Sequence, residues 1–378
     1  MLKEVTEGGS ESGNTSAPIA RKGRRVALIV SIALMVLLTG TGAYLWLGGY
    51  SHWQDKKSLA RACQGILPRD ELESLMSDDL RGTDERMFEV GSGWLDGCTV
   101  EAREGRDGTT QFGIGWSDQV SMPLSALGRI EFAGENGAAT PIGHGWTGSL
   151  TRSGSAGNAS VLLECKGLNK NLLVTARSYR GKFSEASSIS QGFGSLAKVA
   201  TRTAQKAAAK WDCDAPLGRS VDSVTPPAKM ARDLPSLAQA SGSCRSMTSL
   251  TAALSQRKVR KTLDTPEGNS LVEDCYLLDA DGNAVYRLSA YYGPYARDLL
   301  STRAWPNPDP AGIEQKSRYA WASSQCRNFF GTARFTSGIV ENSDKAAAPA
   351  DPGLQRELLA AFVKDSAERH GCSGTELP

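Results

Sequence analysis

The chain has 378 residues, of which 22% are charged and 40% hydrophobic, so it has room for two domains of ordinary size and a short terminal segment. Residues 1–25 hold five of the 43 basic residues and three of the 41 acidic ones, which leaves equal numbers of both in the rest of the chain. A neutral chain lacks the basic surface with which proteins bind nucleic acids, and we expect no nucleic-acid partner.

An uncharged, mainly apolar segment over residues 26–48 directly follows a cluster of four basic residues, Arg21, Lys22, Arg24 and Arg25. At about 1.5 Å per residue, such a segment is long enough to cross a hydrocarbon core of roughly 30 Å. Basic residues on one flank favour a cytoplasmic location for that end. The sequence therefore predicts a single-pass protein of the cell membrane, with a disordered cytoplasmic tail (1–25), a transmembrane helix (26–48), a juxtamembrane segment (49–57) and extracellular C-terminal domains.

A cleaved signal peptide, a lipoprotein and a buried core helix are the alternatives for the apolar segment. Signal peptides have a shorter apolar run and an Ala-x-Ala type of cleavage site, whereas this run ends in Ala43-Tyr-Leu-Trp-Leu-Gly-Gly49. A lipoprotein needs a cysteine directly after the run, and the first cysteine is Cys63. The basic flank argues against a core helix. We favour the uncleaved anchor, with cleavage left open.

Eight cysteines lie beyond the anchor and divide into two sets of four, with successive spacings of 35, 67 and 48 residues and then 31, 51 and 46. Before the first cysteine of each set stand the related sequences Ser58-Leu-Ala-Arg-Ala62 and Ser236-Leu-Ala-Gln-Ala240. Self-similarity at this scale indicates duplication. We predict a first repeat over residues 58–216, a linker over 217–235 that contains Pro226-Pro227, and a second repeat over 236–378.

The local patterns are the same in both repeats. A helix-like stretch follows the first cysteine, and the second cysteine opens a hairpin whose turn is Asp107-Gly108 or Asp281-Gly282. The third cysteine ends a strand, and the fourth follows a long helix, over 196–211 or 354–370. Thr-Ala-Arg recurs at 175–177 and 332–334, which we take to mark equivalent positions. Each repeat is therefore expected to be α+β, with antiparallel strands between helices.

An even number of cysteines beyond a membrane anchor favours disulfides. The absence of a Cys-x-x-Cys pair argues against a metal site, and we expect no cofactor. Within one repeat four cysteines allow three pairings, and pairing the first with the second and the third with the fourth ties each helix to the sheet. The predicted bonds are Cys63–Cys98, Cys165–Cys213, Cys244–Cys275 and Cys326–Cys372.

Catalysis would depend on His144, in Ile142-Gly-His-Gly-Trp146, and the chain has no Gly-x-Ser-x-Gly sequence to supply a nucleophile. We therefore expect the protein not to be an enzyme. The sequence Asp279-Ala-Asp-Gly-Asn283 resembles part of a calcium loop but lies between two strand-like runs, so a hairpin turn is expected there.

Aromatic residues concentrate in the second repeat. Exposed aromatic faces bind glycans and peptides, although aromatic residues also fill cores well. Because Gly293-Pro294 interrupts the sequence around them, the pattern predicts that they lie on a loop. The candidate ligand-binding residues are Tyr291, Tyr292, Tyr295 and Trp305.

The basic flank, the single anchor and the outer domains, which open with a Cys-led helix and close with a helix ending in Cys, resemble uncharacterised membrane-anchored proteins of actinobacteria with duplicated four-cysteine domains. The resemblance implies a cell-envelope location and brings no functional residues. We expect a non-enzymatic binding or accessory role, with the membrane and an envelope protein or glycan as partners. The alternatives are an extracytoplasmic hydrolase that uses His144, and a membrane sensor whose short tail contacts a cytoplasmic protein.

Overall fold

The computed structural model describes residues 19–46, 49–76, 79–84, 93–103, 108–121, 137–179, 183, 188–229, 231, 233–300, 309–314, 319–327, 331–340 and 351–378. The chain forms two compact units, residues 1–54 and 55–378, which are described separately.

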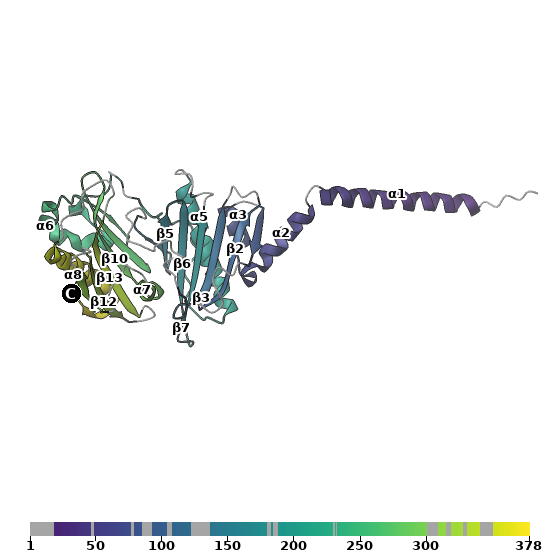
Figure 1. Cartoon of the computed structure of the whole chain (residues 1–378). Helices are drawn as coiled ribbons and strands as arrows, with labels where there is room; N and C mark the ends of the chain where they lie inside the picture. The colour runs from purple at the N-terminus through teal and green to yellow at the C-terminus, as the bar shows by residue number, and fades with distance from the viewer. Residues whose placement is uncertain are drawn as a thin grey trace, which may run out of the picture. The chain divides into compact units, whose positions relative to one another are not determined.

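The first unit contains helix α1 (Ile19–Trp46) and the beginning of α2 (Gly49–Arg61) (Figure 1). Ten large apolar side chains of α1 between Val26 and Leu38 are each more than half exposed. Within the part of the chain that the structure describes, no helix combines the length and the apolar character needed to cross a membrane.

The first repeat is a seven-stranded antiparallel sheet in the order β1-β2-β3-β7-β6-β5-β4. Alternation along β6 separates its two faces. Val161 and Leu163 pack in the core beneath the helices of the first repeat, and Ser160 and Leu162 point to the opposite face, which packs against the second repeat. Helix α5 packs on the first of these faces, against β6 and β7 (Figure 1). The elements are η1 (Ala62–Gly65), α3 (Arg69–Leu75), β1 (Leu80–Thr83), β2 (Trp94–Ala102), β3 (Thr109–Trp116), β4 (Thr140–Gly143), β5 (Trp146–Ser153), β6 (Ala156–Cys165), β7 (Lys170–Tyr179) and α5 (Ile189–Lys210).

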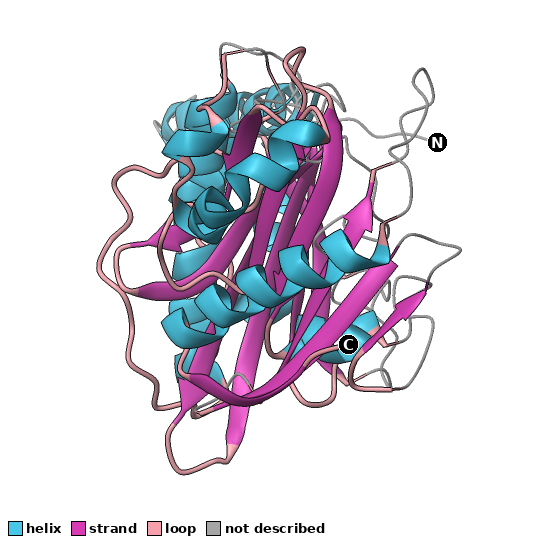
Figure 2. Cartoon of the chain, turned by 90° about the vertical axis from the view of Figure 1, so that its left-hand side faces the viewer, coloured by secondary structure: helices cyan, strands magenta, loops and turns pink. Residues whose placement is uncertain are grey.

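The second repeat has a sheet in the order β11-β12-β13-β10-β9-β8, with β14 also paired to β12. Helix α8 lies across this sheet (Figure 2). Helix α8 is capped by Asp351, whose Oδ1 accepts a hydrogen bond from Leu354 N at 3.1 Å. The elements are η4 (Leu237–Gln239), η5 (Gly242–Leu250), α6 (Thr251–Gln256), β8 (Lys261–Asp264), β9 (Val272–Leu278), β10 (Ala284–Tyr291), α7 (Pro294–Leu299), β11 (Gly312–Glu314), β12 (Tyr319–Cys326), β13 (Thr332–Ile339), α8 (Pro352–Arg369) and β14 (Cys372–Glu376).

The predicted α+β class and all four disulfide pairings are confirmed. The bonds are Cys63–Cys98, Cys165–Cys213, Cys244–Cys275 and Cys326–Cys372. In each repeat one bond joins the segment before the sheet to its second strand, and the other joins the end of a central strand to the residues after the last long helix. Four disulfides indicate an oxidising compartment.

The strand registers extend the correspondence between the repeats to single residues. From Cys98 and Cys275 across the neighbouring strands, Phe112 corresponds to Leu288, and Ala176 to Ser337. The ladders next to Cys165 and Cys326 give the same result, because Asn171 and Thr332 are each paired with the residue before the cysteine, and Ala176 and Ser337 follow five residues later. Two independent routes agree, as a duplication predicts.

The Thr-Ala-Arg recurrence does not mark equivalent positions, and that expectation is wrong. By the ladder register, Arg334 corresponds to Leu173, and Arg177 corresponds to Gly338. The shared triplet is displaced by four residues, which places its side chains in different surroundings in the two repeats.

The two repeats pack against each other and share buried polar contacts. The Ser149 Oγ accepts hydrogen bonds from Leu271 N at 2.8 Å and Val272 N at 3.2 Å. The buried Asp274 accepts from Ala139 N at 2.9 Å and from Arg287 Nη2 at 3.0 Å. Ser149 and Ala139 precede the linker, and Leu271, Val272 and Asp274 follow it, so the three bonds to backbone nitrogens join one repeat to the other. The Asp274–Arg287 pair lies within the second repeat.

Non-reducing peptide mapping of the purified chain should recover the four disulfide pairs above and no others, because each pairing joins residues that the fold holds side by side. A disulfide between residues 63–213 and residues 244–372 would contradict the two-repeat fold.

Candidate functional sites

The predicted aromatic binding face is wrong for the three tyrosines that the structure describes. Tyr291 is 5% exposed, and Tyr292 and Tyr295 are 0% exposed; Trp305 lies outside the described residues. Gly293, with φ +56°, does break the strand, but α7 then carries Tyr295 back into the core that Leu162 and Leu173 of the first repeat share. Burial raises the pKa of Tyr295.

His144 lies in the exposed turn between β4 and β5, with φ +55°. Its Nε2 is 2.8 Å from the backbone oxygen of Ser223, and the neighbouring Trp146 Nε1 donates to Arg219 O at 2.8 Å. These contacts fasten the start of the predicted linker to the first repeat. The histidine partner is a backbone carbonyl, so this geometry does not form the serine–histidine pair of a hydrolase.

The Asp279–Asn283 sequence forms a hairpin turn, as predicted. Asp279 Oδ1 accepts from the backbone nitrogens of Asp281 and Asn283, both at 2.9 Å. The carboxylate is therefore used to close the turn. Among the described residues, no group of three or more His, Cys, Asp or Glu side chains is arranged to hold a metal ion.

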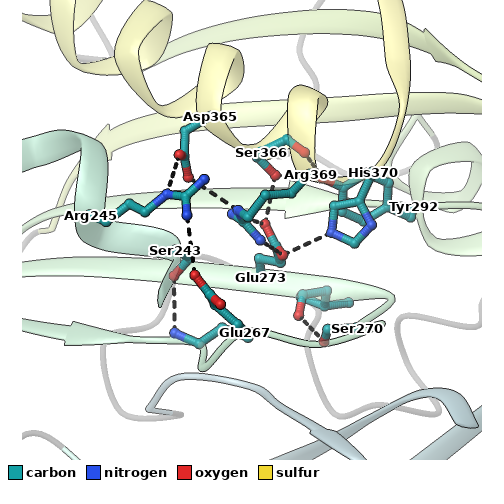
Figure 3. Close-up of polar contacts among 12 residues, drawn as sticks. Ser243, Arg245, Glu267, Ser270, Glu273, Tyr292, Asp365, Ser366, Arg369 and His370 are labelled. Carbon is teal, nitrogen blue, oxygen red and sulfur yellow. Dashed lines mark hydrogen bonds and ion pairs between the residues drawn. The ribbon is translucent and has the colours of Figure 1, made fainter. Parts of the chain in front are cut away.

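A buried polar cluster around Glu273 lies between β9 and the end of α8 (Figure 3). Both oxygens of the Glu273 carboxylate accept from Arg369, at 2.5 and 2.9 Å. Ser366 Oγ donates to Glu273 Oε2 at 2.6 Å, and His370 Nε2 is 2.9 Å from Oε1. The Tyr292 hydroxyl forms a hydrogen bond with Ser366 Oγ. The cluster fastens the last turn of α8 to the sheet.

The charges in the cluster decide the ionisation of Glu273. Burial alone would raise its pKa, but the hydrogen bonds and charges of His370 and Arg369 outweigh burial and lower the pKa to about 2. Burial, together with the charge of Glu273, raises the pKa of Tyr292 well above its ordinary value. The tyrosine is therefore neutral and Glu273 ionised at neutral pH.

The cluster contains a serine, a histidine and an acid, but not in the order of a catalytic triad. In a triad the histidine stands between serine and acid, so that it can take the serine proton. Here Glu273 stands between Ser366 and His370 and accepts from the serine directly. The arrangement stabilises a carboxylate and does not activate a nucleophile.

The first repeat keeps only the acid and the base of this cluster. Asp96 and Glu273 both stand two residues before a disulfide cysteine, and Lys210 and Arg369 both stand three before one. The charge of Lys210 acts on Asp96, but burial dominates and raises the Asp96 pKa. The counterparts of Ser366, His370 and Tyr292 are Ala207, Trp211 and Trp116. The hydroxyls and the imidazole are thus specific to the second repeat.

A pocket of about 310 Å³ opens between the two repeats. The first repeat contributes residues from the turn after β3 and the beginning of β7, and the second contributes the corresponding turn and the beginning of β13. Its lining is Ser117, Asp118 and Asn171 from the first repeat, and Gly293, Pro294, Arg297, Gly331, Thr332 and Arg334 from the second. Ligand sites often lie at such domain interfaces.

A second pocket, of about 290 Å³, lies between α5 and the segment 217–222 of the predicted linker. Its charges are mixed, since Lys198, Arg202 and Arg219 line it together with Glu71 and Asp222. Arg202 Nε is 3.5 Å from Glu71 Oε1, so part of this charge is already paired. We therefore take the pocket between the repeats as the candidate site.

The binding tyrosines predicted from the sequence lie near this pocket, but their side chains do not line it. Between residues 291 and 295, only Gly293 and Pro294, the predicted break, line the pocket. The arginines and hydroxyls of the lining carried no motif, and their proximity depends on packing between the repeats.

Comparison of the chain with protein-family models, with curated proteins and with solved structures gave no match.

Replacing Glu273 by Gln should weaken the loss of stability at acid pH. Because the folded-state pKa is about 2 and the ordinary value is 4.5, ionised Glu273 stabilises the fold above pH 4.5, and this contribution disappears as the pH falls through 2. The difference corresponds to on the order of 3 kcal/mol. Denaturant unfolding measured at a series of acidic pH values checks the slope.

Asp96→Asn is the matched control, because burial raises the pKa of Asp96 and its ionisation adds no such acid-dependent stability. Glu273→Gln should reduce the slope of the free energy of unfolding against pH in the acidic range, and Asp96→Asn should leave that slope unchanged. Equal slopes for the wild-type chain and Glu273→Gln would contradict the assignment.

Tyr295→Ala should destabilise the protein by roughly 3–5 kcal/mol, because it removes a fully buried ring. Leu300→Ala, directly after the same short helix and 41% exposed, should stay within about 0.5 kcal/mol of wild type. Thermal melting of the two variants compares their stabilities. A small loss of stability in Tyr295→Ala would contradict the burial of this ring.

Proposed function

We propose that this chain is a membrane-anchored protein of the cell envelope that holds a pair of disulfide-bonded modules outside the membrane and binds a ligand there without catalysing a reaction. The observation that carries the proposal is the combination of an exposed apolar helix with four disulfides in the chain that follows it.

The apolar helix supports the anchor. Apolar surface of this extent is seldom left in water and marks a surface that contacts lipid or protein. From Val26 to Leu38 every large side chain is apolar and exposed, and Arg21 to Arg25 precede this segment. Lipid tails are the environment that suits such a helix, with the basic residues on the cytoplasmic side.

The disulfides support a location of residues 63–372 on the oxidising side of that membrane, because structural disulfides persist in secreted and periplasmic compartments. Each bond closes a loop of 31 to 48 residues. In the chain-entropy account, loops of this length stabilise a fold by about 3–5 kcal/mol each.

Binding is the activity that the candidate site supports best. The pocket between the repeats offers hydrogen-bond donors from both of them, but the serine and the histidine near Glu273 are arranged to stabilise that carboxylate. His144 is used to hold a backbone segment. The site therefore has the features of a small-molecule pocket, in which a few polar groups orient a ligand.

Deleting residues 26–46 should move the chain from the membrane fraction to the soluble fraction, since it removes the apolar surface. Deleting residues 1–18 is the matched control and should leave the chain in the membrane, because the basic residues and the apolar segment remain. The measurement is immunoblotting of alkali-washed membranes. A full-length chain that washes off, or a mature N-terminus near residue 49, would contradict the anchor.

A further inference from the structure

We propose that the pocket between the repeats binds a small ligand with an oxyanion, a carboxylate or a phosphate, and that Arg334 is the residue that holds this group. The inference rests on the proposed binding function and deepens it by naming the site and the ligand class.

The pocket is built from equivalent positions of the two repeats. Asn171 corresponds to Thr332 through the strand registers. Ser117 and Asp118 follow Trp116, the last residue of β3, and Gly293 and Pro294 follow its counterpart, Tyr292. In both turns the carbonyl of that residue accepts from the backbone nitrogen three residues later. A contact in which residues meet their own counterparts is that of copies related by an approximate two-fold axis.

The two halves of this pocket have diverged in charge. The counterpart of Arg334 is Leu173, which is completely buried and packs against the second repeat. The counterpart of Arg297, counted from the end of the preceding strand, is Ser121. Apolar and small neutral residues are sufficient for packing at these positions in the first repeat. The second repeat instead places two arginines in the lining of the pocket.

The two arginines have different surroundings. Arg297 Nη2 donates to Val120 O at 2.6 Å, and the carboxylates of Asp118 and Asp298 act on its charge, so Arg297 joins the repeats. Burial lowers the pKa of both arginines, and around Arg297 the two carboxylates oppose that effect. Arg334 is partly buried at the pocket wall, and a partly buried guanidinium gains from a bound oxyanion, with which it can form two parallel hydrogen bonds.

The rest of the lining restricts the ligand. Ser117 and Thr332 supply hydroxyls, and Asn171 supplies an amide, all able to donate to an oxyanion. Asp118 lies in the same pocket and would accept from an amino or hydroxyl group of the ligand. The pocket volume of about 310 Å³ is at the lower end of the range for small-molecule sites. The pocket therefore holds either a small ligand or one terminal group of a larger ligand.

The test is calorimetric titration of the full-length chain in detergent with inorganic phosphate and, separately, with succinate, at constant ionic strength. We expect saturable binding of at least one of them, and the one that binds distinguishes a phosphate from a carboxylate ligand. Arg334→Gln should weaken that binding by at least tenfold, which is about 1.4 kcal/mol. A second variant, Arg334→Lys, keeps the positive charge but not the two parallel N–H donors of the guanidinium. Its affinity for the anion should lie between those of wild type and Arg334→Gln.

Arg177→Gln is the control, because Arg177 is also a strand arginine of a Thr-Ala-Arg triplet but lies over the Tyr179 ring, with its Cζ 4.7 Å from the ring centroid, and outside the pocket. Its binding should equal that of wild type. Thermal melting of each variant shows that it is folded.

Absence of saturable binding of either anion, or equal binding by wild type and a folded Arg334→Gln variant, would overturn the proposal. Membrane fractionation of the same chains does not depend on Arg334. A failed pocket with an intact anchor therefore refutes this inference alone, and a released chain that still binds the anion refutes the anchor alone.

Discussion

Hydrogen bonds between buried polar groups of the two repeats are the constraint on which the rest of this structure depends. Ser149 accepts from two backbone nitrogens that precede and begin β9, and Asp274 accepts from Ala139 N. A buried polar group without a partner costs about 1–3 kcal/mol, and an unpaired charge costs more. Arg287, 1% exposed, and Asp274 therefore stabilise each other as a buried ion pair, and the other oxygen of Asp274 accepts from the first repeat. The bonds of Asp274 and Ser149 across the interface fix how the repeats meet and so shape the pocket between them.

The likeness of the two halves is consistent with a duplication, and the differences between them point to function. The disulfides and an acid–base pair, Asp96 with Lys210 and Glu273 with Arg369, recur at equivalent positions. In each repeat one disulfide ties the segment before the sheet to a strand and the other ties the end of a strand to the residues after the last helix, and in the second repeat the Glu273–Arg369 ion pair also holds the end of α8 to the sheet. Other positions differ between the repeats. The second repeat has hydroxyls and an imidazole around Glu273, and it has arginines at the interface. Because a scaffold does not by itself determine function, these differences are where specificity can reside.

Features that depend on neighbours in the sequence were predictable. The cysteine pattern predicted the disulfides, and Asp281-Gly282 predicted a hairpin, because a turn depends on a few neighbouring residues. The meeting of the repeats was not predictable, since Ser149 and Asp274 resemble surface residues until the opposing chain is known. For the same reason Tyr292 and Tyr295 were assigned to a surface: the Gly-Pro break predicted a loop, and only packing against the first repeat buries them. The Thr-Ala-Arg triplet misled because identity over three residues does not report strand register.

Amide hydrogen exchange of the full-length chain carrying Ser149→Ala tests the packing of the two repeats most directly. Ser149 belongs to the first repeat, and the amides that it accepts from, those of Leu271 and Val272, belong to the second. The account predicts that these two amides lose protection in Ser149→Ala. The same two amides should keep their protection in the control variant Ser178→Ala. The Ser178 hydroxyl accepts a hydrogen bond from Thr110, within the sheet of the first repeat. Unchanged protection of Leu271 and Val272 in Ser149→Ala would show that the repeats do not meet through these groups.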